Sequence, residues 1–466
     1  MKIKFLLKLA FFVVGSTFIF NACNKNNDND KTGDTKDLVA DYSAEAQLEW
    51  NKIFLDIERY AAGYRPGPAP RALALMGFAC YEACITGMPD YNSIKSRYAG
   101  LTIPNVEAGK TYHWPTVVHS IYSTMIPKFF PEIKAEVKPR VLGLISNLNQ
   151  KYLDETGSEL FNRSQAFGEI VGNAVWAWST TDFIAHDHYK DPFGNYNYLD
   201  HYKGPGNWVP TVPGPTKPMG AVYGGARTFA ITETEKLCKP PKLYDMKYSE
   251  DPLSNYYGQA LEVYTKNAAT DYNTEWIGEY WSDDLVNLTF SPGPRWTAIL
   301  NQIVENEKAN LETSIFAYVK TGMAISDAAV GAWNSKYVYN IERPDTYIKK
   351  VIDKNYVTNL ENPITGDKSF TPPFPAYPSG HATMGGAGAE AIASVFGYAY
   401  SMTDRCHEGR TEFEGVPRTF GSLYEMAAEN AWSRVLLGVH WAMDCEEGVA
   451  FGTRIGRAVN RLPWKR

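Results

Sequence analysis

The sequence has no excess of positive charge. Its 466 residues carry 46 Lys and Arg against 52 Asp and Glu, which leaves a formal net charge of −6. Because surfaces that bind nucleic acid are basic, no nucleic-acid partner is predicted. Any anion that this chain binds must be held by a local cluster of cations. The 44% hydrophobic content is ordinary for a globular protein with a large core.

Cysteine is scarce, and its spacing lacks the paired C-x-x-C pattern that is typical of zinc sites. Five cysteines follow Cys23, and this odd number leaves at least one thiol outside any intramolecular disulfide. Cys80 and Cys84 lie four residues apart on a predicted helix, where small buried side chains are a simpler interpretation than ligands. The sequence therefore predicts no zinc site and leaves the disulfide pairing open.

No apolar run is long enough to predict a transmembrane helix. The stretch from Phe5 to Phe20 is short and interrupted, and three lysines among the first eight residues give it the character of an export signal. The sequence Phe20-Asn-Ala-Cys23 resembles a lipoprotein processing box, although Phe20 stands where Leu is usual. We predict a lipoprotein signal peptide over 1–22 and a polar, flexible tether over 23–40. The protein would be exported and held by a lipid on Cys23, in the periplasm or at the outer-membrane surface; plain secretion is the alternative.

Strands are few in the sequence pattern. Alternation between polar and apolar residues is rare, and no internal repeat of fixed period is present. Apolar residues instead recur at helical spacing, as from Trp50 to Ala61 and from Leu311 to Ala329. Helices are predicted over residues 50–61, 70–84, within 114–180, from about 250 onward, over 311–329, 380–397 and 421–461.

Two segments rich in proline and glycine interrupt the helical patterns. The first is Lys203–Gly220, where the prolines and glycines exclude regular structure, and the second is residues 353–378, a further loop that contains five prolines. Loops of this length are usually functional or wrap a scaffold. We predict an all-α fold of two helix bundles packed together, with an N-terminal half over 41–225 and a C-terminal half over 226–466.

Three short segments of the C-terminal half carry groups that suit an oxyanion. Taken singly, each has an ordinary explanation, such as solvated surface charges or a helix start. Together they supply three cations, a hydroxyl, a backbone amide at a helix start and two histidines. The segments are Lys336-Tyr-Val-Tyr-Asn-Ile-Glu-Arg343-Pro344, Pro378-Ser379-Gly380-His381 and Ser433-Arg434-Val-Leu-Leu-Gly-Val-His440-Trp-Ala-Met-Asp444.

The residue types explain why these segments suit an anion. Arginine binds oxyanion oxygens with two parallel donors, and lysine adds a point charge. Ser379 and Gly380 begin a predicted helix, whose free N–H groups and dipole favour negative charge. His381 is then placed to give or take a proton, and His440 is the remaining candidate for a bond to the central atom. Asp444 could orient His440 or offset its charge.

The three segments match, in order, the K-x6-RP, PSGH and SR-x5-H-x3-D pattern of a known superfamily. It is the superfamily that vanadium haloperoxidases share with bacterial acid phosphatases and lipid phosphate phosphatases. The match covers residues 336–444, and every motif position is filled. The resemblance implies an all-α fold of paired bundles and one pocket that takes vanadate or phosphate through the same contacts.

The resemblance to the haloperoxidases also implies roles for these residues. His440 would coordinate vanadate, His381 would act as acid and base, and hydrogen peroxide and a halide would react to give hypohalous acid. Small organic acceptors are further possible partners. In the phosphatases of the superfamily, His440 would instead form a phosphohistidine, and His381 would protonate the leaving group. The groups that would hold the vanadate oxygens are Lys336, Arg343, Ser379, Gly380 and Arg434. Lys336 and Asp444 are also predicted to be catalytic, together with His381 and His440.

Several features favour the haloperoxidase. Phe374 and Trp333 stand where fungal chloroperoxidases have aromatic residues, and would form an apolar wall beside a halide; the alternative is that both are core aromatics. The chain is also much longer than the soluble acid phosphatases. Asp283 or Asp284 is predicted to pair with Arg434. Iodide and bromide are easier to oxidise than chloride, so we predict oxidation of iodide or bromide rather than of chloride.

A glycan-binding surface lipoprotein is the alternative of a different class. The predicted lipid anchor and the 30 Tyr and 12 Trp residues are compatible with it. It does not explain why three cations, the PSGH sequence and a His–Asp pair occur in the order of the superfamily. A pseudoenzyme that binds the anion without turnover is a further alternative, and the complete set of motif residues argues against it.

Overall fold

The computed structural model describes residues 38–190, 195–211, 216–240, 247–269 and 271–466. The predicted signal peptide, Cys23 and most of the predicted tether lie outside the described residues. All the described residues belong to one compact unit. The packed part begins before the predicted tether ends, because Val39 is fully buried in the 3-10 helix η1 (Val39–Asp41).

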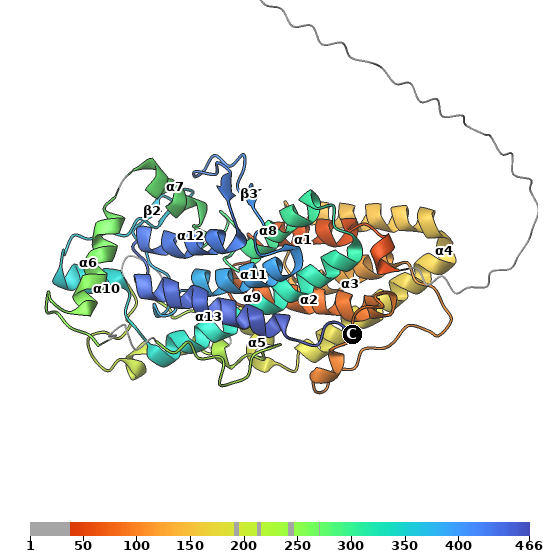
Figure 1. The fold of residues 1–466 in the computed structure, drawn as a ribbon, viewed down its shortest axis with the longest axis horizontal. Coiled ribbons are helices and arrows are strands. Elements are labelled where there is room, and N and C mark those ends of the chain that lie inside the picture. The colour runs from red at the N-terminus through yellow and green to blue at the C-terminus, as the bar shows by residue number, and fades with distance from the viewer. Residues whose placement is uncertain (1–37, 191–194, 212–215, 241–246, 270) are drawn as a thin grey trace, which may run out of the picture. The chain divides into compact units, whose positions relative to one another are not determined.

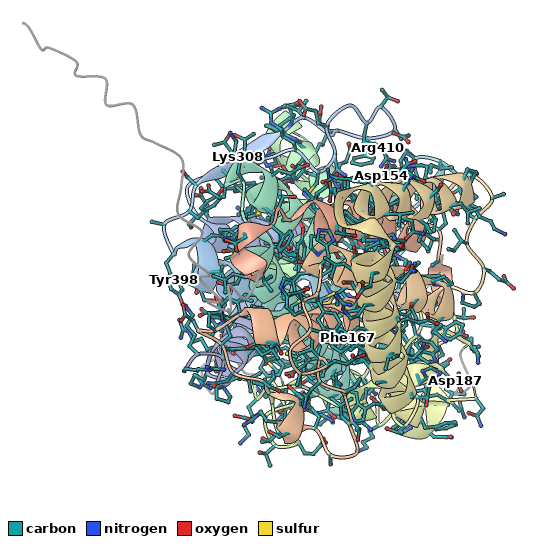
Figure 2. All side chains as sticks on the ribbon, turned by 90° about the vertical axis from the view of Figure 1, so that its right-hand side faces the viewer. Asp154, Phe167, Asp187, Lys308, Tyr398 and Arg410 are labelled. Carbon is teal, nitrogen blue, oxygen red and sulfur yellow. The ribbon has the colours of Figure 1, made fainter. Side chains whose placement is uncertain are left out.

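The predicted all-α class is confirmed, and the first half is built from helices that proline and glycine delimit. Pro68 is the first residue of α2, so this helix starts two residues earlier than predicted. Helix α4 consists of two helical arms, which meet at a kink at Gly157, where φ is 72° (Figure 1). Figure 2 shows these arms from another side, with Asp154 on the first and Phe167 on the second. The helices are α1 (Glu45–Glu58), α2 (Pro68–Cys84), α3 (Trp114–Phe129), α4 (Lys138–Ser179) and α5 (Phe183–His186).

The second half contains the longest buried helices and two short hairpins. Strand β1 (Glu361–Asn362) pairs with β2 (Asp367–Lys368), and β3 (Met402–Asp404) pairs with β4 (Arg418–Phe420), both antiparallel. The helices are α6 (Asn255–Asn267), α7 (Tyr272–Tyr280), α8 (Pro294–Asn306), α9 (Leu311–Tyr339), α10 (Pro344–Val351), α11 (Gly380–Phe396), α12 (Leu423–Leu436) and α13 (Ala442–Asn460).

The core lies around α9 and α11. α9 packs against α2 of the first half, and α11 packs against α9, α12 and α13 (Figure 1). Small residues make the contact between α11 and α13 close: a Cβ on Gly452 would lie 1.9 Å from the carbonyl oxygen of Thr383. The two predicted halves thus share one hydrophobic core. Among the described residues, no helix has both the length and the apolar character needed to cross a bilayer.

The predicted helix over 421–461 is wrong in one respect. It breaks into α12 and α13, and the chain turns at Gly438, which has a φ of 75°. A Cβ at Gly438 would lie 2.2 Å from the hydroxyl of Tyr356, so both the conformation and the space require glycine. The break places His440 in the connection between the helices.

Candidate active site

A cavity of about 250 Å³ is lined by residues of the second and third motif segments, and Arg343 of the first segment lies behind this lining, in contact with His440. Its lining includes Gly380, His381, Arg434 and His440, and Trp333 and Phe374 form part of its wall. Asp283 and Asp284 line it as well. Residues that are about 160 positions apart in the chain, from 283 to 440, therefore line the same cavity.

Helix ends position most of these side chains. Lys336 lies in the last turn of α9, which ends at Asn340 in a left-handed conformation, with a φ of 51°. Arg343 is the N-cap residue of α10, directly before Pro344. Ser379 caps α11, and its hydroxyl accepts a hydrogen bond from the amide of Ala382. The chain thus uses short connections between helices, which are local in sequence, to direct charged groups inward.

His440 is held in one tautomer by its two neighbours. The guanidinium of Arg343 lies 2.9 Å from Nε2 of His440, and because arginine only donates, Nε2 must be the acceptor. The Nδ1–H group then donates to the carboxylate of Asp444 at 2.9 Å. Burial and the nearby Arg343 and Lys336 lower the pKa of His440 well below its usual value, so the imidazole is neutral. Its Nε2 lone pair faces the cations.

Asp444 lies in the first turn of α13 and fixes the loop that carries His440. Besides the bond from His440, its carboxylate accepts a hydrogen bond from the amide of Trp441 at 3.1 Å. Burial raises the pKa of Asp444, and Lys336 and Arg343 oppose this effect. The backbone carbonyl of Asp444 accepts from the amide of Ser379, which joins α13 to the start of α11.

Asp284, rather than Asp283, pairs with Arg434. Arg434 is fully buried, and its Nη2 donates to the carboxylate of Asp284 at 2.6 Å. The same carboxylate lies 3.8 Å from Nε2 of His381. Burial and Arg434 lower the pKa of His381 to about 3, so this histidine is neutral at pH 7. Asp283 instead lies 3.5 Å from Nη1 of Arg295.

Lys336 is turned toward backbone carbonyls. Its ammonium donates to the carbonyls of Pro375, Ala376 and Pro378 at 3.0, 2.9 and 2.6 Å. These three bonds use all three N–H groups of the ammonium, so contact with an anion requires one of them to be exchanged. Burial and Arg343 lower the pKa of Lys336 well below its usual value. In this arrangement Lys336 supports the segment that leads from Phe374 to Ser379.

Two aromatic rings cover one side of the site. The rings of Trp333 and Phe374 are 5.0 Å apart, and the ammonium of Lys336 and the guanidinium of Arg343 each lie 5.0 Å from the Phe374 ring. A Cβ on Gly380 would lie 3.2 Å from the ring of Trp333, so the helix start packs directly on this wall. The wall excludes water from the cations and increases the strength of their electrostatic interactions.

Several buried polar atoms of the site have no hydrogen-bond partner among the described residues. They are the donors Nη2 of Arg343 and Nε and Nη1 of Arg434, and the ring atom Nε2 of His381. Buried donors without partners destabilise a fold by about 1–3 kcal/mol each, so such a group of them points to a ligand. A tetrahedral oxyanion offers several acceptor oxygens in one place, and the residues present fit it.

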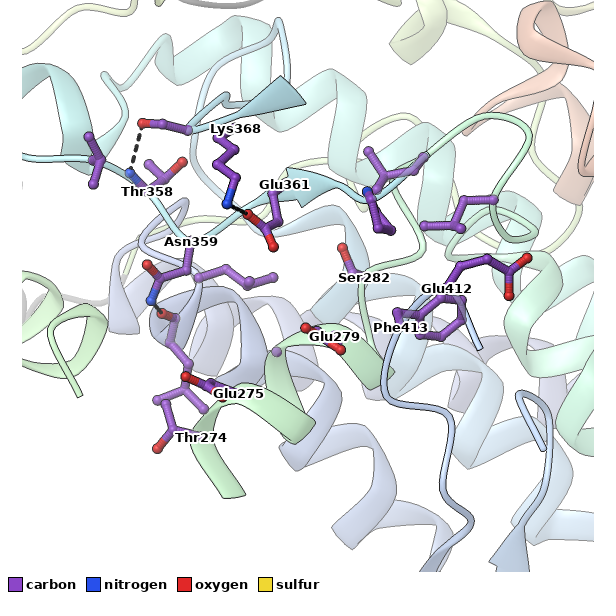
Figure 3. Close-up of a pocket in the computed structure, with 18 of the residues that line it drawn as sticks. Thr274, Glu275, Glu279, Ser282, Thr358, Asn359, Glu361, Lys368, Glu412 and Phe413 are labelled. Atoms are coloured by element: carbon purple, nitrogen blue, oxygen red, sulfur yellow. Dashed lines mark hydrogen bonds and ion pairs between the residues drawn. The ribbon is translucent and has the colours of Figure 1, made fainter. Parts of the chain in front are cut away.

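A second, larger cavity lacks this chemistry. It measures about 580 Å³ and is lined by acidic side chains, among them Glu275, Glu279 and Glu412 (Figure 3). The ammonium of Lys368, which also lines it, pairs with the carboxylate of Glu361 at 3.0 Å. Its excess of carboxylates opposes an anion, so the smaller cavity is the candidate active site.

Sequence reasoning did not identify several residues of the site. Arg65 and Pro66 of the first half line the cavity. Pro292, just before α8, and Met384, on α11, line it as well. His407 does not line the cavity but lies directly behind it, 3.5 Å from Asp283 and 2.5 Å from Arg295. None of these residues belongs to a motif, and only tertiary packing brings them to the site.

Comparisons of the sequence find similarity to proteins that are named as vanadium haloperoxidases. Residues 316–463 match a family model described as the VCPO second helical-bundle domain. The chain is 25% identical to the vanadium chloroperoxidase of Curvularia inaequalis, over 88% of this chain and 80% of that protein. It is 27% identical to the vanadium-dependent bromoperoxidase of Ascophyllum nodosum, over 27% of this chain and 25% of that protein.

Comparisons of the structure extend the likeness to nearly the whole chain. A crystal structure described as the first bacterial vanadium-dependent iodoperoxidase matches with a TM-score of 0.75 and 26% identity, over 91% of this chain and 97% of that chain. The holo form of a bacterial vanadium-dependent chloroperoxidase matches with a TM-score of 0.60 and 13% identity, over 84% of this chain and 89% of that chain. The second likeness concerns the fold alone.

Proposed function

The chain belongs to the vanadium haloperoxidase family, and from this premise we propose that it oxidises halide ions with hydrogen peroxide in a vanadate-dependent reaction. The observation that carries the proposal is the group of buried polar atoms without partners on Arg343, Arg434 and His381. They lie near a neutral His440, whose Nε2 lone pair accepts a hydrogen bond from Arg343 and would bind a central atom once Arg343 turns to the ligand's oxygens.

The donor set suggests how vanadate would be held. Arg343 and Arg434 would neutralise its oxygens, the amide at Gly380 would donate from the start of α11, and Nε2 of His440 would bind the metal. Bound vanadate supplies a Lewis acid that activates hydrogen peroxide and need not change its oxidation state. Phosphate is expected to compete for the same contacts.

His381 is the group that moves a proton. It is neutral at pH 7, and its Nε2 atom has no partner among the described residues, so it can accept a proton from hydrogen peroxide in the cavity. The carboxylate of Asp284, 3.8 Å away, would stabilise the resulting imidazolium. An oxyanion in the site adds negative charge, which raises the pKa of His381 toward the range in which it works.

The halide would react beside the wall formed by Trp333 and Phe374. A desolvated halide suits an apolar wall better than a hydrated phosphate ester does, and this favours oxidation over phosphate transfer. Since iodide and bromide lose electrons more readily than chloride, we propose that iodide and bromide are oxidised in preference to chloride.

The test uses the protein without residues 1–23, stripped of bound anions. Orthovanadate and hydrogen peroxide are added, and the oxidation of iodide, bromide and chloride is measured in parallel with hydrolysis of a generic phosphate monoester. Halide oxidation that depends on vanadate and is inhibited by phosphate is the expected result. Phosphate release that vanadate inhibits, without halide oxidation, would show a phosphatase with His440 as its nucleophile.

A further inference from the structure

Arg65 is a buried cation that faces the active-site cavity from the first half of the chain. Its side chain is 5% exposed and lines the same cavity as His381, Arg434 and His440. It follows the turn η2 (Ala62–Tyr64), between α1 and α2, far in sequence from the three motif segments.

Most of the donors of Arg65 are not used by the protein. Nη2 donates to the carbonyl of Asp283 at 3.2 Å, whereas Nε and Nη1 have no hydrogen-bond partner among the described residues. Burying a guanidinium with free donors is unfavourable unless a ligand satisfies them. The unused donors therefore indicate an anion.

The carboxylate nearest to Arg65 is already engaged elsewhere. Glu58 lies 3.6 Å from Nε of Arg65, beyond hydrogen-bond distance, and its two oxygens accept from the amide and the hydroxyl of Ser291 at 3.0 and 2.6 Å. Glu58 thus offsets the charge of Arg65 without occupying its donors. An anion bound here would meet a nearly neutral pair rather than several cations.

This charge balance distinguishes two positions in one cavity. The motif segments place Arg434 in the cavity lining and Arg343 against His440, and these two cations suit an oxyanion of high charge. Arg65 with Glu58 suits a small anion of single charge that binds weakly and leaves, as a substrate must. Arg65 bonds to the backbone of Asp283, and Arg434 bonds to the side chain of the next residue, Asp284, so one short segment holds both guanidinium groups.

We propose that Arg65 forms a second anion subsite in the cavity, and that it takes the halide ion. The proposal rests on the proposed haloperoxidase function and names the residue that would bind its monovalent substrate. The halide would accept hydrogen bonds from Nε and Nη1 of Arg65, in the same cavity that His381, Arg434 and His440 line.

Two measurements test the subsite with the variant Arg65→Gln. The first is the line width of bromide in 81Br NMR, recorded with the vanadium-free protein, because a bound halide broadens this line. We expect the broadening to be lost in Arg65→Gln and largely kept in Arg65→Lys. The second is steady-state kinetics of the vanadate-loaded enzyme. The KM for iodide should rise by about tenfold or more, with kcat and the KM for hydrogen peroxide changed much less.

A matched control is available in Arg71→Gln. Arg71 is also buried, donates to one backbone carbonyl, that of Ser179, and lies 3.6 Å from one carboxylate, that of Asp182, but it does not line this cavity. The Arg71→Gln variant should leave the bromide line width and the KM for iodide unchanged. If Arg65→Gln does not fold because Glu58 is left without its partner, the double variant Glu58→Gln/Arg65→Gln removes both charges and should show the same loss.

The outcomes separate the subsite from the function. Bromide broadening that is equal in the wild type and in Arg65→Gln, with an unchanged KM for iodide, overturns the subsite even if halide oxidation is present. Broadening that depends on Arg65 in a protein that never oxidises halide supports the subsite and overturns the haloperoxidase function.

Discussion

At the scale of the residue, His440 is the position on which the proposed chemistry depends most. Its Nε2 lone pair faces Arg343, and its Nδ1 is fixed by Asp444. We predict that His440→Ala lowers vanadate-dependent halide oxidation at least about 100-fold, because loss of even an outer partner of a metal ligand costs 10–100-fold. Halide oxidation at the wild-type rate would show that His440 does not bind the metal. The thermal unfolding curve of the variant establishes that it is folded.

Phe374 is the residue at which halide preference can be tested. Its ring lies 5.0 Å from the ring of Trp333 and 5.0 Å from the ammonium of Lys336. Phe374→His replaces an apolar surface with a hydrogen-bonding one, so we expect the ratio of kcat/KM for bromide to that for iodide to change by about threefold or more. This ratio is independent of the fraction of active enzyme. An unchanged ratio would remove Phe374 from the halide wall and leave it as a core aromatic.

At the scale of the element, the contact between α11 and α13 holds Ser379 next to Asp444. A Cβ on Gly452 would lie 1.9 Å from the carbonyl oxygen of Thr383, and helix backbone cannot move away easily. Gly452→Ala should therefore lower the free energy of unfolding by about 1–3 kcal/mol or more, although Ala is the better helix former. Denaturant unfolding measures the change.

The control for that substitution is Gly258→Ala. Gly258 lies on an exposed part of α6, and a Cβ there has no neighbour within 4 Å. It should be neutral or stabilise the protein by up to about 1 kcal/mol. If the two substitutions change the free energy of unfolding equally, α11 and α13 do not pack as closely as the 1.9 Å approach implies.

His119 joins three helices of the first half and gives the fold a dependence on pH. Its Nδ1 accepts a hydrogen bond from the indole of Trp50 on α1, and its Nε2 lies 3.1 Å from the amide oxygen of Asn149 on α4. Burial lowers the pKa of His119 to about 4, against about 6.5 in an unfolded chain. Between pH 6.5 and 4 the unfolded chain binds a proton that the folded protein does not.

The free energy of unfolding therefore decreases as the pH falls through this range, with a contribution from His119 of up to about 1.4 kcal/mol per pH unit. The contribution is absent above pH 6.5. Denaturant unfolding of the wild type and of His119→Gln, at several pH values, isolates it, because other titrating groups cancel in the difference. A difference that stays constant between pH 4 and 6.5 would contradict the assignment.

At the scale of the whole molecule, the site combines residues that sequence can identify with residues that it cannot. The three motif segments were recognisable because each is short, and because oxyanion binding restricts which residue types fill it. The start of α2 was predicted to within two residues because proline favours the first turn of a helix, whereas α10, which begins at Pro344, was not predicted. Arg65 was not predictable, since it reaches the cavity only through the packing of α1 and α2 against the second half. The choice between Asp283 and Asp284 likewise needed the position of Arg295.

Attachment to a membrane is the last proposal, and it concerns the chain as a whole. The first residues have the character of an export signal that ends at Cys23, and the packed fold begins near Val39. We propose that the protein is exported and lipid-modified at Cys23, so that the enzyme is held about 15 residues from a membrane surface. The wild type, produced in bacteria that grow with an alkyne-labelled fatty acid, should incorporate the label and sediment with membranes. Cys23→Ala should lose the label and remain unprocessed, whereas the control Cys406→Ala should retain it. A wild-type protein that is cleaved and released without the label would show plain secretion, and the active site would then work free of any surface.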